Sequence, residues 1–437
     1  MGAKSDSSSA NRLEQVLAQR LSTALLPGDA PFSAESLAAA AAFLCSAANQ
    51  RDAGEAAITI ATVSGSAAER FMRIGVINDD MPFLVDSIAT TLAAQGLTID
   101  RLVHPVVPVR RDGNGMLAAV VDGDAAGEKR ESMVYIETRR ADAKVRRALE
   151  SALRTTLADV RAAVADWPKM QAAMADDADS LADGEGAALL RWFKDGMLTQ
   201  LGNVLRHRDG TQSNALGICR RGAKSLLGPI SYERAFAWFE GKGRAMRGPL
   251  VVKSNHVSNV HRRTPLDLFI VPVFDGGKLE ALSVHAGIWT SAGLAAAPTQ
   301  VPRMRTQLSE LMARFGFAPQ GHAGKALVHA LTALPHDLLI GFAEADLERV
   351  VTTMMSLVDR PRPKLALVPA ALMRHLFAFV WLPRDIMSTG TRLQIEAMLV
   401  EACGAPILDW SLEVDGSLAV LRFVLDLPEV ARLPDEA

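Results

Sequence analysis

The sequence predicts an α+β fold in which two ferredoxin-like units flank a third α/β unit, with helical connectors between them. Three patterns support this prediction. The elements from Phe71 onward follow the order βαββα, which is close to the ferredoxin-like βαββαβ arrangement. Two apolar runs flank Asp275-Gly276-Gly277, a hairpin signal. Residues 376–425 follow a second such pattern, βαββ, with another hairpin signal at Asp415-Gly416.

Residues 1–54 are expected to form a polar tail and helices, from Asn11 to Ala24 and from Ala34 to Ala48. The segment Met1–Ala10 has no apolar core, so it does not read as a signal peptide. The chain also has no run of about 18 apolar residues, the length a membrane span needs. Its three cysteines are far apart in the sequence, as expected in a reduced compartment. We therefore predict a cytoplasmic location.

Residues 55–165 are predicted to form the first ferredoxin-like unit. An apolar strand, Phe71–Ile77, enters a polar turn, and Pro82 suits the first turn of the helix that follows. Gly96 is placed to end that helix. Strands are expected over Leu97–Val109 and Met133–Glu137. A second helix then shows one apolar face, formed by Val145, Leu149, Leu153, Leu157, Val160 and Val164.

The turn between the first strand and its helix is the best candidate for a ligand site. We call it the effector loop, and it consists of Asp79, Asp80, Met81, Pro82 and Phe83. Backbone N–H groups at the helix N-terminus could meet a small anionic ligand. The alternative is a plain connection whose carboxylates cap the helix and whose bulky Phe83 fills the space. We favour this packing role.

A linker is predicted over 166–186, because this segment carries Asp and Ala but little bulk. Residues 187–298 form the middle unit and contain a basic polar cluster. Its members are Lys253, Asn255, His261 and Arg262. The cluster predicts either an anion site, with a histidine that titrates near neutral pH, or a domain interface. We favour the interface, because strands follow the cluster directly.

Residues 299–360 are predicted to be a helical segment, and residues 361–437 form the second ferredoxin-like unit. That unit needs one more helix and strand than 376–425 provides. Either Glu344–Val368 supplies them from the N-terminal side, or the polypeptide is cut out of something longer.

Several chemistries find no support in the sequence. A net charge of −2 argues against a general nucleic-acid binder. The glycines of Gly241–Gly248 follow a helical segment rather than a strand, which argues against a dinucleotide loop. The histidines show no metal-ligand spacing, and no Ser–His–Asp set has local support. We therefore predict no catalytic residue, no cofactor site and no metal site in this chain.

The effector loop also carries a family resemblance. A strand, then Asp-x-Pro-x-Leu, then a helix resembles the ACT domain, a small-molecule regulatory module. The longer string Asp80–Ser87 resembles the N-terminal region of the large bacterial NAD-specific glutamate dehydrogenases. Further segments resemble that family in the same order and bring its span to roughly residues 70–425: Leu189–Gly196, Lys253 to Ser258, Val260–Arg262, Thr290–Ala292, Arg314–Phe317, Gly324–Leu327 and Val380–Asp385.

The resemblance implies that both ferredoxin-like units are ACT-like and that the chain is a regulatory and assembly portion of such an enzyme. The family reaction is the oxidation of L-glutamate to 2-oxoglutarate with NAD. The resemblance places the dehydrogenase domain C-terminal of this region, so we expect this chain alone to be inactive. It also implies self-association or docking onto the dehydrogenase portion, and an amino-acid effector. Residues 187–298 resemble a PAS-like sensory fold, which leaves a free-standing ACT/PAS-like amino-acid sensor as the alternative.

Overall fold

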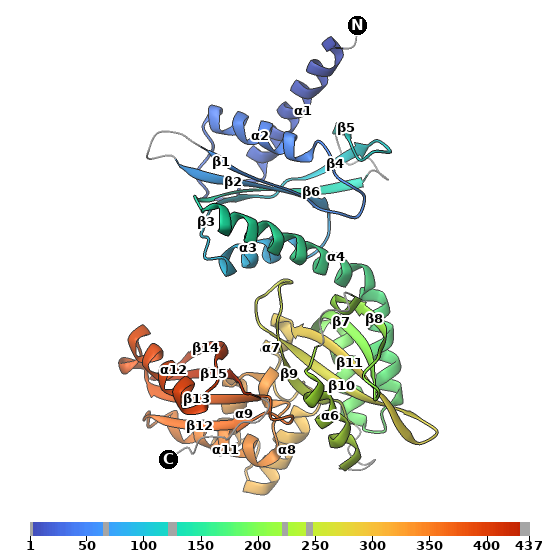
Figure 1. Cartoon of the computed structure of the whole chain (residues 1–437). Helices are drawn as coiled ribbons and strands as arrows, with labels where there is room; N and C mark the ends of the chain where they lie inside the picture. The colour runs from blue at the N-terminus through green and yellow to red at the C-terminus, as the bar shows by residue number, and fades with distance from the viewer. Residues whose placement is uncertain (1–2, 64–69, 121–128, 221–225, 242–247, 429–437) are drawn as a thin grey trace. The chain divides into compact units, whose positions relative to one another are not determined.

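A computed structural model describes residues 3–63, 70–120, 129–220, 226–241 and 248–428 (Figure 1). The chain divides into two compact units. The first unit is Met1–Val164 together with the short segment Asn259–Arg263, and the second is Ala165–Ser258 together with Thr264–Ala437. Helices pack on three sheets, and the strand pairings in the described ranges are antiparallel. The predicted α+β class is confirmed at this level.

The first unit contains one sheet with the order β1-β2-β6-β4-β5, in which β3 also pairs with β6. The strands are β1 (Ala57–Val63), β2 (Phe71–Asp79), β3 (Ile99–Val103), β4 (Val106–Arg111), β5 (Leu117–Val120) and β6 (Lys129–Arg139). A single strand over Leu97–Val109 was therefore the wrong prediction. Proline has no N–H to donate to a ladder, and Pro105 lies between the two strands that replace it.

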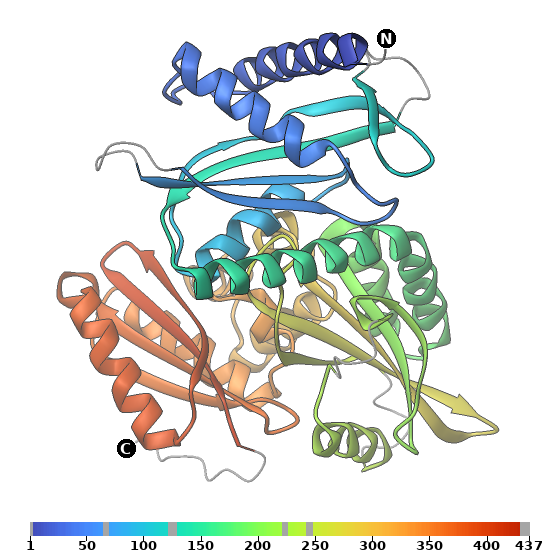
Figure 2. The ribbon, with the colours of Figure 1, turned by 45° about the horizontal axis from the view of Figure 1, so that its top comes forward.

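Helices cover both faces of this sheet. They are α1 (Ala3–Thr23), α2 (Ala34–Ala48), α3 (Leu84–Ala94) and α4 (Ala143–Ser180). Figures 1 and 2 show α1 and α2 on one face and α3 and the first part of α4 on the other. Leu17, Leu44 and Tyr135 belong to the core beneath α1 and α2. On the opposite face, Thr91 of α3 and Thr156 of α4 share a hydrogen bond of 3.0 Å.

The segment predicted as a linker, 166–186, is helical as far as Ser180 because α4 continues through it. Met170, Met174 and Ala178 are buried there. Alanine and methionine are good helix formers, so low bulk in this segment indicated a helix.

The second unit begins with a five-stranded sheet in the order β8-β7-β11-β10-β9. The strands are β7 (Leu198–His207), β8 (Gln212–Gly217), β9 (Leu250–Val257), β10 (Pro265–Asp275) and β11 (Lys278–Trp289), and the helices are α5 (Gly184–Trp192), α6 (Pro229–Gly241) and α7 (Ser291–Ala295). The β10–β11 hairpin turns at Gly276 and Gly277, whose φ angles of 53° and 84° suit glycine.

The rest of the second unit contains helices and a four-stranded sheet in the order β12-β13-β15-β14. The elements are α8 (Met304–Phe315), α9 (His322–Ala333), α10 (His336–Leu339), α11 (Glu344–Leu357), β12 (Lys364–Pro369), β13 (His375–Pro383), α12 (Thr389–Cys403), β14 (Ile407–Asp415) and β15 (Leu418–Asp426). The segment Glu344–Val368 does contain a helix and most of a strand, α11 and β12, on the N-terminal side of the βαββ pattern. However, α11 and α12 pack on opposite faces of this sheet, whereas the ferredoxin-like arrangement has both helices on one face. In this sheet and in the first one, the first strand lies beside the strand that leads into the helix.

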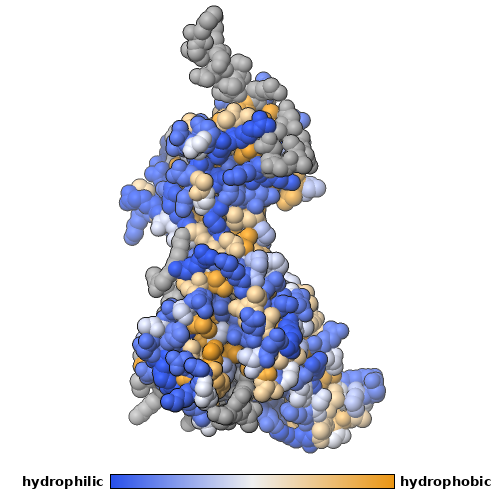
Figure 3. All heavy atoms as spheres, turned by 90° about the vertical axis from the view of Figure 1, so that its right-hand side faces the viewer, coloured by the Kyte–Doolittle hydropathy of each residue, from blue (hydrophilic) through white to orange (hydrophobic). Residues whose placement is uncertain are grey.

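The two faces of this last sheet are covered unequally. Phe377, Phe379 and Trp381 face a core shared with α11, whereas Leu376 and Phe423 face α12. Exposed apolar side chains gather on α12 and β14: Leu393, Met398, Val400, Trp410, Leu412 and Val414. Elsewhere, hydrophobic residues occur among hydrophilic ones in small groups, as Figure 3 shows for one side, which is normal for protein surfaces. In the described ranges, no helix has the length and apolar character that crossing a membrane needs.

Candidate functional site

The effector loop connects β2 to α3 in the first unit, and its backbone is unusual at Phe83. This residue is the N-cap of α3 and has a left-handed conformation with φ of 70°. No side chain caps the helix there. The helix begins at Leu84, so Pro82 lies before the helix rather than in its first turn. The predicted end holds, because Gly96 adopts φ of 71° just past the last turn.

The first carboxylate of the loop is already paired. Asp79 accepts a hydrogen bond of 2.6 Å from Arg51 Nη2 and a second, shorter one from Arg161. Burial acts to raise the pKa of Asp79, but the hydrogen bonds from Arg51 and Arg161 outweigh it and hold the pKa below its usual value. Arg161 also donates to the side-chain oxygen of Asn78, 2.6 Å away. Asp79 therefore connects the loop to α4, and its carboxylate is already bound by protein side chains.

Arg51 extends this network into the sheet. Its Nη2 also donates to Glu131 Oε1 at 2.7 Å, and Arg111 grips both oxygens of Glu131 at 2.7 and 2.8 Å. Glu131 is 1% exposed, so two arginines compensate a buried charge. Sequence reasoning missed this network, because Arg51 and Glu131 are 80 residues apart and no local pattern joins them.

The second carboxylate of the loop is accessible. Asp80 is exposed, and its Oδ1 accepts a hydrogen bond of 2.9 Å from the Ser132 hydroxyl. Ser132 in turn lies 2.9 Å from His104 Nε2. Burial lowers the pKa of His104, although the charge of Asp80 opposes this. Asp80 thus presents an exposed carboxylate near the N-terminus of α3, where the helix dipole favours negative charge.

The arm Asn259–Arg263 packs against the same loop and belongs to the first unit. The backbone N–H of His261 donates to Ser87 Oγ at 2.9 Å, and His261 Nδ1 lies 2.9 Å from Asp86 Oδ2. The His261 ring lies 5.3 Å from the ring of Phe83. Ser87 also donates to the carbonyl of Phe83. A continuous chain of hydrogen bonds therefore joins the arm to the left-handed residue of the loop.

The predicted basic cluster divides between the two units. His261 belongs to the arm of the first unit and, like Phe83, has a positive φ, of 64°. Arg262 belongs to the arm too. Lys253 and Asn255 lie in β9 of the second unit. The four residues therefore do not form a single site within either unit.

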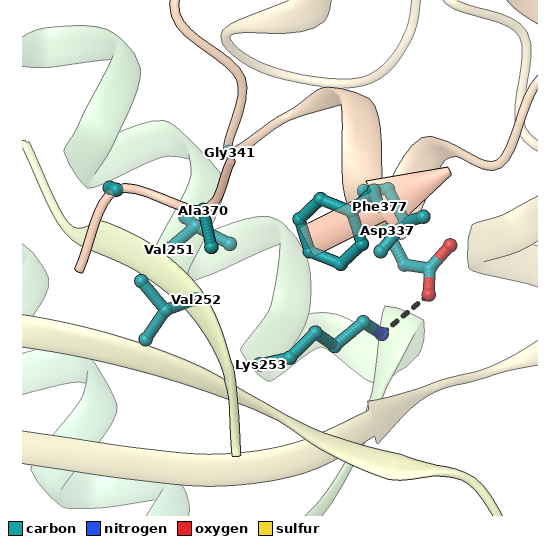
Figure 4. A pocket seen from close by; sticks show the side chains of 9 residues that line it. Val251, Val252, Lys253, Asp337, Gly341, Ala370 and Phe377 are labelled. Atoms are coloured by element: carbon teal, nitrogen blue, oxygen red, sulfur yellow. Dashed lines mark hydrogen bonds and ion pairs between the residues drawn. The ribbon is translucent and has the colours of Figure 1, made fainter. Parts of the chain in front are cut away.

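Lys253 is buried and paired with two carboxylates. Its ammonium group lies 2.6 Å from Asp267 of β10. It also lies 2.6 Å from Asp337 of α10, as Figure 4 shows. Burial acts to lower the pKa of Lys253, but the charges of Asp267 and Asp337 outweigh it and raise the pKa. Burial raises the pKa of Asp267 to about 7. For Asp337 the charges of Lys253 and Arg422 outweigh burial and lower the pKa.

The space beside this ion pair cannot hold an effector. The cavity lined by Val251, Lys253, Asp337 and Phe377 has a volume of about 10 Å³, which is room for one water molecule at most. With two carboxylates on its ammonium group, Lys253 is a poor anion receptor. Its geometry supports an internal connection between the five-stranded sheet and α10.

Asn255 and the end of β15 form a second polar contact in this unit. Asn255 donates to Asp426 of β15, whose carboxylate also pairs with Arg374 at 2.7 Å, just before β13. The neighbouring His375 is 1% exposed, and burial together with the charges of Arg374 and Lys253 lowers its pKa to about 3. His375 is therefore neutral at physiological pH.

A larger cavity in the second unit was not foreseen. Its volume is about 820 Å³, and its lining includes Trp238, Arg303, Gln307 and Glu310. Arg303 has φ of 68°, a strained conformation for a residue with a side chain. Nothing in the local sequence distinguishes Arg303 from an ordinary surface arginine. In the parts of the chain that the structure describes, no group of His, Cys, Asp and Glu could hold a metal ion.

Comparison with known proteins places these features in a family context. Residues 18–153 match the ACT1 domain of glutamate dehydrogenase, and residues 301–360 match its helical motif 1. A NAD-specific glutamate dehydrogenase of Pseudomonas aeruginosa is 28% identical over 82% of this chain and 24% of its own length. That of Halomonas elongata is 29% identical over 80% of this chain and 23% of its own length. That of Mycobacterium tuberculosis is 24% identical over 81% of this chain and 22% of its own length. The chain thus spans about a quarter of the length of the curated relatives it matches.

Proposed function

Because the chain carries the ACT1 domain and helical motif 1 of the NAD-specific glutamate dehydrogenase family, we propose that it is the N-terminal regulatory and assembly portion of such an enzyme. The observation that carries the proposal is the order and extent of the match. This chain matches both family segments, and about 80% of its length aligns with each of the first two relatives. In the whole enzyme, L-glutamate, NAD⁺ and water would give 2-oxoglutarate, ammonium, NADH and a proton.

The architecture supports a role outside catalysis. Dinucleotide folds of the Rossmann type are built on parallel strands joined by βαβ crossovers. The three sheets in the described ranges are antiparallel instead. NAD would therefore bind the dehydrogenase portion of the full-length protein, and the chain would contribute effector recognition and assembly.

The finer fold assignment is part of the same proposal. The last sheet repeats the strand order of the first, which supports a second ACT-like unit. The middle sheet has its first two strands at one edge and its third at the other, which supports a PAS-like unit between them. A ligand for the effector loop would need a group that suits the α3 N-terminus and a cationic group for Asp80, as an α-amino acid has.

The direct test is catalytic. The purified chain, supplied with L-glutamate and NAD, is expected to form no NADH, and calorimetry is expected to give a dissociation constant for NAD weaker than roughly 1 mM, or about −4 kcal/mol. NADH formation or tighter NAD binding would overturn the proposal. A reading frame that continues past Ala437 into dehydrogenase sequence is expected. A stop codon there would favour a free-standing amino-acid sensor instead.

A further inference from the structure

The arm Asn259–Arg263 is seated in the first unit by one buried side chain and several polar contacts. Val260 is 0% exposed, so it acts as the apolar anchor of the arm. Asn259 donates to Asp159 Oδ2 of α4 at 2.8 Å. His261 contacts Ser87 and Asp86 of α3, as described above. The arm therefore spans from α4 to the first turn of α3.

The seated arm occupies the place that a ligand of the effector loop would need. The first turn of α3 offers its backbone N–H groups and the Ser87 hydroxyl to an anionic ligand. Ser87 already accepts the His261 N–H and donates to the Phe83 carbonyl. The His261 ring lies beside the Phe83 ring, at 5.3 Å. An incoming ligand would thus compete with His261 for the same groups.

The backbone is strained on both sides of the contact between the arm and the effector loop. Phe83 has φ of 70° and His261 has φ of 64°, both in the left-handed region. Such conformations are unfavourable for residues with side chains and persist where surrounding contacts maintain them. Each of these residues is held by the other through Ser87.

We propose that the arm is a latch that closes the effector loop, so that seating of His261 and binding of an amino-acid effector exclude each other. The arm continues directly into β9 and β10, so its release would change the ends of two strands. The proposal of an amino-acid effector rests on the proposed function, whereas the latch itself does not.

Amide hydrogen exchange in the full chain tests the latch, because the His261 N–H is itself part of it. Ser87→Ala removes the acceptor of this N–H, and we expect exchange at His261 to rise at least tenfold. Thr90→Ala is the matched control on the same helix, since Thr90 Oγ1 donates only to helix carbonyls, those of Asp86 and Ser87. Equal exchange in the two variants, or exchange of wild-type His261 only on global unfolding, would show that the arm is a fixed part of the fold.

A second pair of variants tests gating, with L-glutamate and glycine as probes in calorimetry. Proline at 261 has no N–H and cannot adopt φ of 64°, so His261→Pro should release the arm. Glycine accepts this angle and keeps the N–H, so His261→Gly should leave the arm seated. We expect at least one probe to bind the proline variant tenfold or more tightly than the glycine variant. Equal binding, or no binding when exchange shows an open arm, would overturn the gate.

This outcome is separable from the test of the proposed function. NADH formation by the chain would refute the regulatory assignment without touching the exchange result. Unchanged exchange in Ser87→Ala would refute the latch without bearing on the dehydrogenase assignment.

Discussion

The sheet of the first unit and the last sheet of the second unit share a strand order, but their helix-bearing faces differ. In the first, α3 lies beside α4 and buries Leu84, Ile88 and Leu92. In the last, α12 buries Leu399 and Cys403 alone among its described residues. In the first unit, α4 thus packs beside α3 and covers its apolar side chains. In the last sheet, α12 keeps an exposed apolar surface. The difference teaches that equal topology does not give equal burial, and so does not give an equal role.

The largest expected effect separates two leucines in corresponding helices. Leu92 of α3 is 0% exposed and Leu393 of α12 is 51% exposed. Leu92→Ala should lower the free energy of unfolding by about 2–5 kcal/mol, because it leaves a cavity. Leu393→Ala should change it by less than about 0.5 kcal/mol. Urea unfolding measures both, and similar losses would break the comparison.

An acid-sensitive histidine is expected to distinguish the two sheets next. The folded-state pKa of His375 is about 3, below the ordinary value of about 6.5 for an unfolded chain. Its contribution to stability is therefore complete above pH 6.5 and is lost as the pH falls toward 3, because the unfolded state binds the proton first.

For His375 this amounts to about 2 kcal/mol between pH 7 and pH 5. His375→Gln should reduce the loss of unfolding free energy over that range by about this amount. Denaturant titrations at both pH values measure it, with His104→Gln as the comparison variant. His104 lies between β3 and β4 of the first unit, and burial lowers its pKa as well. An unchanged pH slope in His375→Gln would show that this histidine does not carry the effect.

A smaller effect concerns Phe83, which precedes the helix with φ of 70°, a conformation that favours glycine. Phe83→Gly should therefore be more stable than Phe83→Ala by about 1 kcal/mol. Thermal or urea unfolding of the pair decides this. A less stable glycine variant would mean that the left-handed conformation does not exist in solution.

The smallest expected change in stability is at the apolar surface of α12. Met398 is 68% exposed, so Met398→Lys should alter the unfolding free energy by less than about 0.5 kcal/mol. If this face mediates the predicted self-association, the variant should dissociate at concentrations where the wild type is associated. Light scattering over a dilution series tests this, with Glu401→Gln on the same helix as a control that changes the charge by the same +1. Identical association in all three proteins would place the interface elsewhere.

Local signals in the sequence predicted much of the fold. Gly96 marked a helix end, and Asp275–Gly277 marked a hairpin. Both positions need a positive φ angle, which glycine adopts more easily than other residues. The turn over residues 79–83 was predicted in the same way, whereas its role as an effector site stays a prediction. Long-range pairing was not predictable: the arginine network around Glu131 joins residues from five separate segments. Nor could sequence spacing show that His261 and Lys253, eight residues apart, belong to different units.

The arm gives the first unit a discontinuous chain, and this constrains the order of events during synthesis. The main part of the unit ends at Val164, but its last segment, Asn259–Arg263, is made about 100 residues later. At roughly 5–20 residues per second, a ribosome needs about 5–20 s to reach it. During that interval the nascent unit would expose the surface that Val260 later buries. A chaperone that recognises apolar surface could bind the nascent unit during that interval. Once Asn259–Arg263 is synthesised and packs, it would displace the chaperone.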